Sequence, residues 1–198
     1  MATLFVGGVL LALAFAQPPG RLTFYLLTMA VAATWVIGGA LSGPLPLGPR
    51  VAAGWRTAIG VPVATGLAAA GAVVASVVLV RQVPGLRGFV DDLLTRARGP
   101  AAPTALVTLA NGGAEEVFFR GTVFAALGPR RPVARSTAVY ASVMVATGNP
   151  ALVVAAVALG VLFGLQRRAS GGILAPLLTH LTWSAALLVA LPPLGPNR

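Results

Sequence analysis

Two adjacent carboxylates, followed four residues later by an arginine, lie in a segment that is otherwise apolar. On a helix, Glu116 and Arg120 share one face, so their spacing predicts an ion pair. Glu115 points about 100° away from Glu116 and has no partner within its own helix. An unpaired carboxylate in an apolar site can act as a general base. The alternative is a helix end with both acids in water, but the neighbouring Phe118 and Phe119 argue against it.

The chain has one histidine, His180, which lies inside another long apolar segment. Ser184 follows four residues later and is expected on the same helical face. A neutral imidazole bonded to a backbone carbonyl is the alternative interpretation of a single buried histidine. Together with the two glutamates, the His180 and Ser184 pair predicts a polar site among apolar helices.

The composition defines what kind of protein must position these residues. Of 198 residues, 57% are hydrophobic and 9% are charged, whereas soluble domains average about a quarter charged residues. So few charges cannot cover a surface that faces water, which excludes a soluble globular domain. There is no cysteine, and the net charge of +10 comes from arginines spread along the chain. We therefore expect a multi-pass integral membrane protein, in the plasma membrane, with the lipid bilayer as a partner and no nucleic acid.

The apolar segments predict an all-α bundle of six or seven transmembrane helices, since about 20 apolar residues span a bilayer. The predicted helices cover residues 1–16, 22–41, 59–80, 104–127, 136–166 and 173–191. Gly148-Asn149-Pro150 divides 136–166 into two shorter helices that meet at a turn. Residues 1–16 could instead be a signal peptide, but no arginine or lysine precedes the apolar run of this segment, which favours a retained helix. The polar stretch 81–100 predicts a short interfacial helix over 88–97.

Small residues recur every four positions at Ala156, Gly160 and Gly164. In a membrane, such a stripe lets two helices approach closely, so it predicts a packing face rather than a catalytic one.

The order of these motifs resembles the CPBP family of intramembrane proteases, which includes CAAX prenyl proteases and bacteriocin-processing, abortive-infection proteins. The matching motifs, in order, are Glu115-Glu116-x-x-x-Arg120, Phe163-Gly164-Leu165, Gly172-x-x-x-Pro176 and His180. The resemblance covers about residues 104–191, so we expect N-terminal membrane helices with an interfacial segment in 1–100 and a catalytic core in 101–198.

Carried over residue by residue, the resemblance implies that Glu115 activates water and that Glu116 and Arg120 support it. His180 matches the histidine of the third family motif. Two further positions differ from the family pattern: Asn149 stands where the second motif has histidine, and Ser184 stands where the third has asparagine or aspartate. An amide can still donate a hydrogen bond to an oxyanion. The implied catalytic set is thus Glu115, His180 and Asn149.

The resemblance implies an intramembrane endopeptidase that cleaves a membrane-associated peptide or a CAAX-type protein. It also raises the question of a divalent metal, but one histidine without any cysteine cannot build a site with two histidines and a glutamate, so no cofactor is expected. Two alternatives remain: an inactive membrane scaffold or immunity-type binding protein, and a small transporter with Glu115 and His180 as a proton relay.

Overall fold

The computed structural model describes residues 1–48, 56–97 and 99–195, and the described chain is helical without strands. This confirms the predicted all-α class. The helices are α1 Ala2–Phe15, α2 Leu22–Ala40, α3 Val61–Val80, α4 Arg87–Ala97, α5 Ala101–Glu115, α6 Phe124–Ala126, α7 Pro132–Met144, α8 Pro150–Ser170 and α9 Leu174–Ala190. Short π-helical segments cover Arg56–Gly60 and Glu116–Val123, and short 3₁₀ segments cover Val145–Thr147 and Pro192–Leu194.

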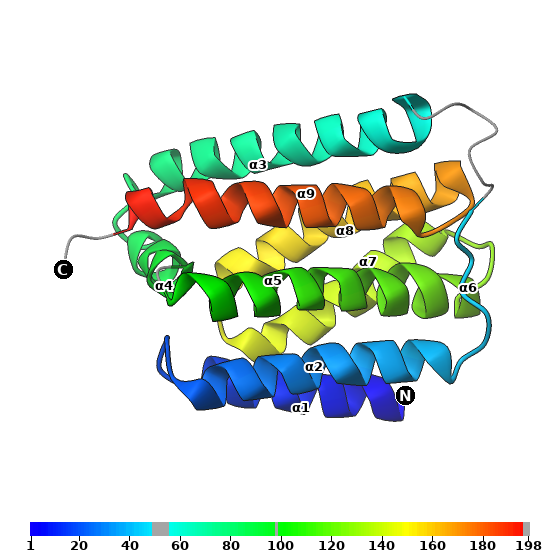
Figure 1. The fold of residues 1–198 in the computed structure, drawn as a ribbon, viewed down its shortest axis with the longest axis horizontal. Coiled ribbons are helices and arrows are strands. Elements are labelled where there is room, and N and C mark those ends of the chain that lie inside the picture. Colours follow the sequence, from blue (N-terminus) through cyan, green and yellow to red (C-terminus); the bar gives the residue numbers. More distant parts are fainter. Residues whose placement is uncertain (49–55, 98, 196–198) are drawn as a thin grey trace.

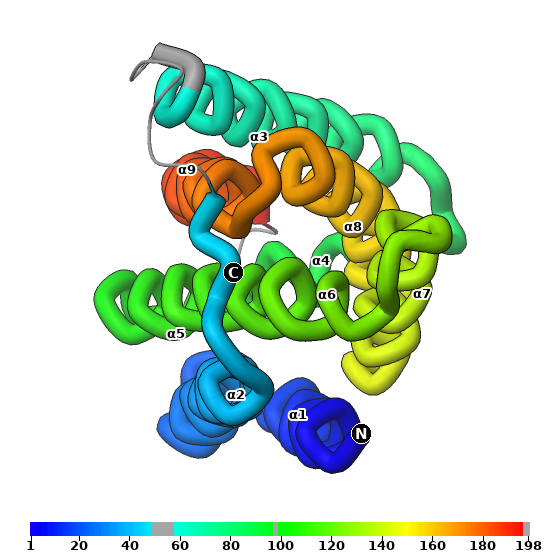
Figure 2. Tube along the Cα trace, turned by 90° about the vertical axis from the view of Figure 1, so that its right-hand side faces the viewer, coloured from blue at the N-terminus to red at the C-terminus, as the bar shows by residue number. Residues whose placement is uncertain are grey.

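The long helices lie side by side in a bundle, with the α1 and α2 pair on one side and α3 on the other (Figure 1). Seen from one end, α5 lies between the α1 and α2 pair and the α3 and α9 pair (Figure 2). The C-terminal end of α5 therefore meets α2 and α9, while α7 and α8 pack on each other beside it. This central position makes α5 the helix that can bring side chains of several others together.

Three helical stretches are long and apolar enough to cross a bilayer: Leu22–Ala40, Ala58–Val80 and Pro150–Ser170. Two shorter apolar helices, Ala2–Phe15 and Leu174–Ala190, accompany them. The chain is thus an integral membrane protein, and the number of spans, six or seven, stays a prediction. The predicted turn at 148–150 is confirmed, because Gly148 adopts a positive φ of 68° and α8 begins at Pro150.

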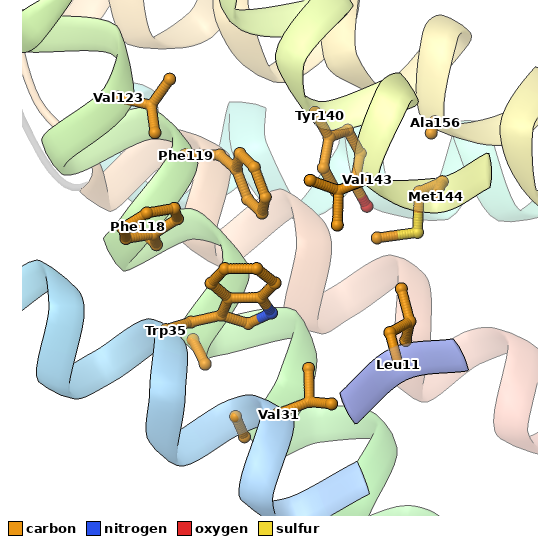
Figure 3. Packing of buried hydrophobic residues seen from close by; sticks show 12 residues of the cluster. Leu11, Val31, Trp35, Phe118, Phe119, Val123, Tyr140, Val143, Met144 and Ala156 are labelled. Atoms are coloured by element: carbon orange, nitrogen blue, oxygen red, sulfur yellow. The ribbon is translucent and has the colours of Figure 1, made fainter. Parts of the chain in front are cut away.

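Aromatic packing fixes the segment that carries the two glutamates against the N-terminal helices (Figure 3). Trp35 of α2 is completely buried and stacks on Phe118, with ring centroids 4.9 Å apart. Its ring also lies 5.2 Å from that of Phe119. Gly7 of α1 faces the Trp35 ring so closely that a Cβ there would overlap it. The buried indole thereby ties α1 and α2 to the segment that follows α5.

The small-residue stripe of α8 is a packing face, as predicted. Gly160 lies against Thr137 and Gly164 against Val133, both on α7, and a Cβ at either glycine would come within 3.0 Å of that side chain. Ala156 is buried in the same core as Trp35. α7 and α8, on either side of the 148–150 turn, are therefore held close together, although α8, with 21 residues, is longer than the short helix predicted there.

The connection after α2 crosses one end of the bundle (Figure 2). Pro46 accepts a hydrogen bond from the backbone N–H of Ile173 at 2.8 Å. Leu45 lies against Gly121, where a Cβ would come within 2.9 Å of it. This connection therefore covers the end of the π-helical segment.

Close packing of α3 on α9 depends on Gly66. A Cβ at Gly66 would lie 2.7 Å from the carbonyl oxygen of Thr179 and 3.1 Å from the backbone nitrogen of Trp183. We expect Gly66→Ala to destabilise the protein by about 1–3 kcal/mol, because backbone cannot move aside as a side chain can. Gly71→Ala on the same helix is the matched control, since nothing lies within 4 Å of a Cβ there. The check is the thermal unfolding midpoint in detergent, and equal midpoints for the two variants would contradict this account.

Candidate active site

A change of helix type occurs where the two glutamates lie. Glu115 ends α5, and Glu116 begins the π-helical segment that runs to Val123. π-Helical turns are rare and occur often at functional sites. The Nε of Arg167, on α8, donates a hydrogen bond of 2.9 Å to the carbonyl oxygen of Arg120 in this segment. The two glutamates are therefore held at a junction supported by a second helix.

The predicted ion pair between Glu116 and Arg120 is present and fully buried. Arg120 Nη1 lies 3.0 Å from Glu116 Oε1, and the side chains are 1% and 0% exposed. Aromatic rings flank the guanidinium, with the centroid of Tyr140 at 4.7 Å and that of Phe163 at 5.1 Å. A buried charge is tolerated when it is paired and well contacted, and Arg120 meets both conditions.

His180 joins the same carboxylate from α9. Its Nδ1 lies 2.9 Å from Glu116 Oε1, so one carboxylate oxygen contacts both Arg120 and His180. The imidazole stacks on Phe163 at a centroid distance of 4.9 Å, and Trp183 contacts it edge-on at 5.5 Å. Since Nδ1 is engaged by Glu116, Nε2 is the ring nitrogen left for water or a substrate.

Glu115 is held differently from its neighbour. The hydroxyl of Tyr140, on α7, donates a hydrogen bond of 2.6 Å to Glu115 Oε2. Among the described residues, none donates a hydrogen bond to its other oxygen, and the side chain is only partly buried. Glu116 Oε2 also lacks a hydrogen-bond partner among the described residues, but it is completely buried. Glu115 is thus the glutamate that combines a free oxygen with partial exposure.

Gly112 brings α9 close to this group. A Cβ at Gly112 would lie 3.2 Å from His180 Nε2 and 3.5 Å from Ser184 Oγ. His180 and Ser184 therefore face the same point of α5, one turn before Glu116, as their four-residue spacing predicts. The absence of a side chain at Gly112 leaves the available ring nitrogen of His180 next to the backbone of the glutamate helix.

A family comparison covers this part of the chain. Residues 97–186 match the family model of the type II CAAX prenyl endopeptidase, Rce1-like. These residues are Rce1-like. The match confirms the family resemblance seen in the sequence, and Glu115, Glu116, Arg120 and His180 all lie within it. No curated protein and no solved structure gave a significant match.

At the level of the family, the match supports a membrane protease. It begins at the end of α4 and runs through most of α9, so α1, α2 and α3 lie outside it. The helices outside the match still contact the site, because Trp35 of α2 packs on Phe118 and Phe119.

Asn149, the remaining residue of the predicted catalytic set, lies in the Rce1-like segment but contacts α4 and the start of α8. Its side-chain oxygen accepts a hydrogen bond from the backbone N–H of Ala151 and caps the start of α8. Its amide nitrogen donates to the carbonyl oxygen of Phe89 at 3.0 Å and to Asp92 Oδ2 at 3.3 Å. The residues that the structure brings together are Glu115, Glu116, Arg120, His180 and Ser184. The Asn149 side chain instead binds α4 and caps α8.

The donor atoms of the Rce1-like segment do not fit a catalytic metal. No group of three histidine or acidic side chains converges among the described residues. Glu116 Oε1 already contacts Arg120 and His180 Nδ1. Glu116 Oε2 has no hydrogen-bond partner among the described residues but is completely buried. His180 Nε2 and the Glu115 carboxylate are therefore the donors that remain accessible, whereas catalytic zinc usually takes three protein ligands.

Two residues of the site were not predicted as site residues from the sequence. Tyr140 and Phe163 reach it from α7 and α8, and their contacts with Arg120 join positions 20 or more residues apart. Phe163 belongs to a motif of the family resemblance, but its contacts with His180 and Arg120 required the structure.

Proposed function

We propose that the protein is an intramembrane endopeptidase in which Glu115 activates the attacking water. The observation that carries the proposal is the difference in burial and contacts between the two glutamates. Glu116 is fully buried and binds Arg120 and His180 through Oε1. Glu115 is only partly buried and keeps one carboxylate oxygen without a hydrogen-bond donor among the described residues. A general base needs such a free oxygen within reach of the proton that it removes.

In the proposed reaction, Glu115 takes a proton from water, and the resulting hydroxide attacks the carbonyl carbon of the scissile peptide bond. His180, oriented by Glu116, presents Nε2 to the developing oxyanion or to its proton. The C–N bond then breaks, and the proton held by Glu115 passes to the leaving amine. Asn149 is not part of this scheme, because its amide is bound to Phe89 and Asp92.

The proposed substrate is a membrane-associated peptide or a CAAX-type protein, as the Rce1-like match suggests. The proposed setting is the plasma membrane, crossed several times by the apolar helices. A protein of this kind would meet its substrate at or within the bilayer, where the partly exposed Glu115 lies among apolar helices.

The test is a cleavage assay with the purified full chain in lipid nanodiscs. A panel of membrane peptides, with and without a C-terminal CAAX sequence and prenyl group, is incubated with wild type and with Glu115→Gln. Mass spectrometry identifies any new termini. Cleavage at a defined bond by wild type, lost in Glu115→Gln, supports the proposal.

The second candidate is an inactive membrane scaffold or binding protein. The observation that favours it is Asn149, which stands at the second-motif position and is bound into the fold. Absence of cleavage across the whole panel, with the protein folded, would overturn the endopeptidase and favour this alternative.

Any cleavage is expected to be independent of zinc. His180 is the only histidine and there is no cysteine, so the site offers too few ligands for catalytic zinc. Treatment with a strong chelator should therefore leave the cleavage rate of the purified protein unchanged. Loss of activity with the chelator, restored by one equivalent of zinc, would contradict this prediction and show that the site binds catalytic zinc.

A further inference from the structure

We infer that Tyr140 is a positioning residue that fixes the carboxylate of Glu115 for the removal of a proton from water. The inference rests on the proposed function and adds to it a residue of α7 that no sequence motif marks. The observation is the hydrogen bond of 2.6 Å that the Tyr140 hydroxyl donates to Glu115 Oε2. Hydrogen bonds to a charged acceptor are short and about twice as strong as neutral ones.

The Tyr140 ring is itself held in place. It is 5% exposed and belongs to the core cluster that includes Trp35 and Phe119. Its centroid lies 4.8 Å from that of Phe119 and 4.7 Å from the guanidinium carbon of Arg120. A phenol packed in this way has little freedom, so its hydroxyl has a defined position.

A defined donor matters because a glutamate side chain is flexible. When Tyr140 holds Oε2, the rotation of the Glu115 carboxylate is fixed and the other oxygen faces one direction. The same tyrosine contacts Arg120, which binds Glu116, which binds His180. One continuous set of contacts thus joins the proposed base to the histidine that would meet the oxyanion.

Positioning predicts an effect on the rate of the chemical step and none on substrate binding. We expect Tyr140→Phe to lower kcat by about tenfold or more with KM unchanged, because small misplacements of a reacting group are costly. The change removes one hydroxyl and keeps the ring against Arg120. In a Glu115→Gln background, Tyr140→Phe should cause no further loss.

The matched control is Tyr25→Phe. Tyr25 is also a buried tyrosine that bonds across helices to α5, through Thr104 at 3.2 Å, but it lies near the opposite end of that helix. Tyr25→Phe should leave kcat and KM unchanged. If the Tyr140 hydroxyl had only a structural role, Tyr140→Phe would alter the unfolding midpoint and leave kcat unchanged. An equal loss of kcat in both variants would indicate a general loss of packing and would contradict the inference.

The nanodisc cleavage assay is run with wild type, Tyr140→Phe, Tyr25→Phe, Glu115→Gln and the double variant Glu115→Gln/Tyr140→Phe. Thermal unfolding is measured for each protein. Cleavage that requires Glu115 but has the same kcat in Tyr140→Phe overturns this inference and leaves the endopeptidase standing. A Tyr140→Phe variant that does not fold also overturns it, since the hydroxyl would then be structural. Absence of any Glu115-dependent cleavage overturns the proposed function and this inference together.

Discussion

Replacement of Glu115 by glutamine is expected to lower kcat for peptide cleavage by about 10²–10⁴-fold, the usual contribution of a positioned general base. The amide has the same size as the carboxylate but cannot take a proton from water. Its oxygen can still accept the hydrogen bond from Tyr140. The unfolding midpoint in detergent should therefore equal that of wild type, so the loss would be one of chemistry.

Asp91→Asn is the matched control for that change. Asp91 lies on α4 and pairs with Arg81 and Arg87, away from the glutamates. The same acid-to-amide change there should leave kcat unchanged. Cleavage by Glu115→Gln at the wild-type rate would assign the base to another residue.

Removal of the Arg120 side chain should be the most destabilising single change in the site. Arg120→Ala leaves Glu116 completely buried with His180 as its one remaining hydrogen-bond partner among the described residues. Breaking one member of a buried ion pair typically costs about 3–5 kcal/mol, because the other charge stays unpaired. The space between the rings of Tyr140 and Phe163 would be emptied as well. Yield and unfolding midpoint in detergent measure the effect.

Arg168→Ala provides the comparison, because Arg168 is exposed on α8 and makes no ion pair in the described part of the chain. That variant should unfold at the wild-type midpoint. If Arg120→Ala were as stable as Arg168→Ala or Glu115→Gln, the Glu116 and Arg120 pair would not be the stabilising contact that its burial indicates.

The parts of the site that sequence could predict are those set by local spacing. Glu116 and Arg120 lie four residues apart, and the same spacing puts His180 and Ser184 against Gly112. Gly148 and the following proline likewise mark a turn by their own backbone preferences. Each of these statements depends on geometry within one helix or one turn.

The parts that could not be predicted depend on contacts between helices. Spacing leaves open which of two adjacent glutamates faces α9, and the structure shows that Glu116, rather than Glu115, contacts His180. The Tyr140 hydroxyl reaches Glu115 only because α7 packs beside the end of α5. Asn149 matched a motif position by order along the chain, but the start of α8 and the approach of α4 determine its contacts.

The π-helical segment Glu116–Val123 also bears on how the gene for this chain can change in length. A π-helical turn holds one residue more than the α-helical turn that could replace it. Deletion of Thr122 could therefore be absorbed as an α-helical turn, with the spacing of Glu116 and Arg120 intact. Deletion of Ala114 would instead rotate Gly112 by about 100° relative to Glu116 and remove it from beneath His180. Single-codon deletions should thus be tolerated after Arg120 and eliminated between Gly112 and Glu116.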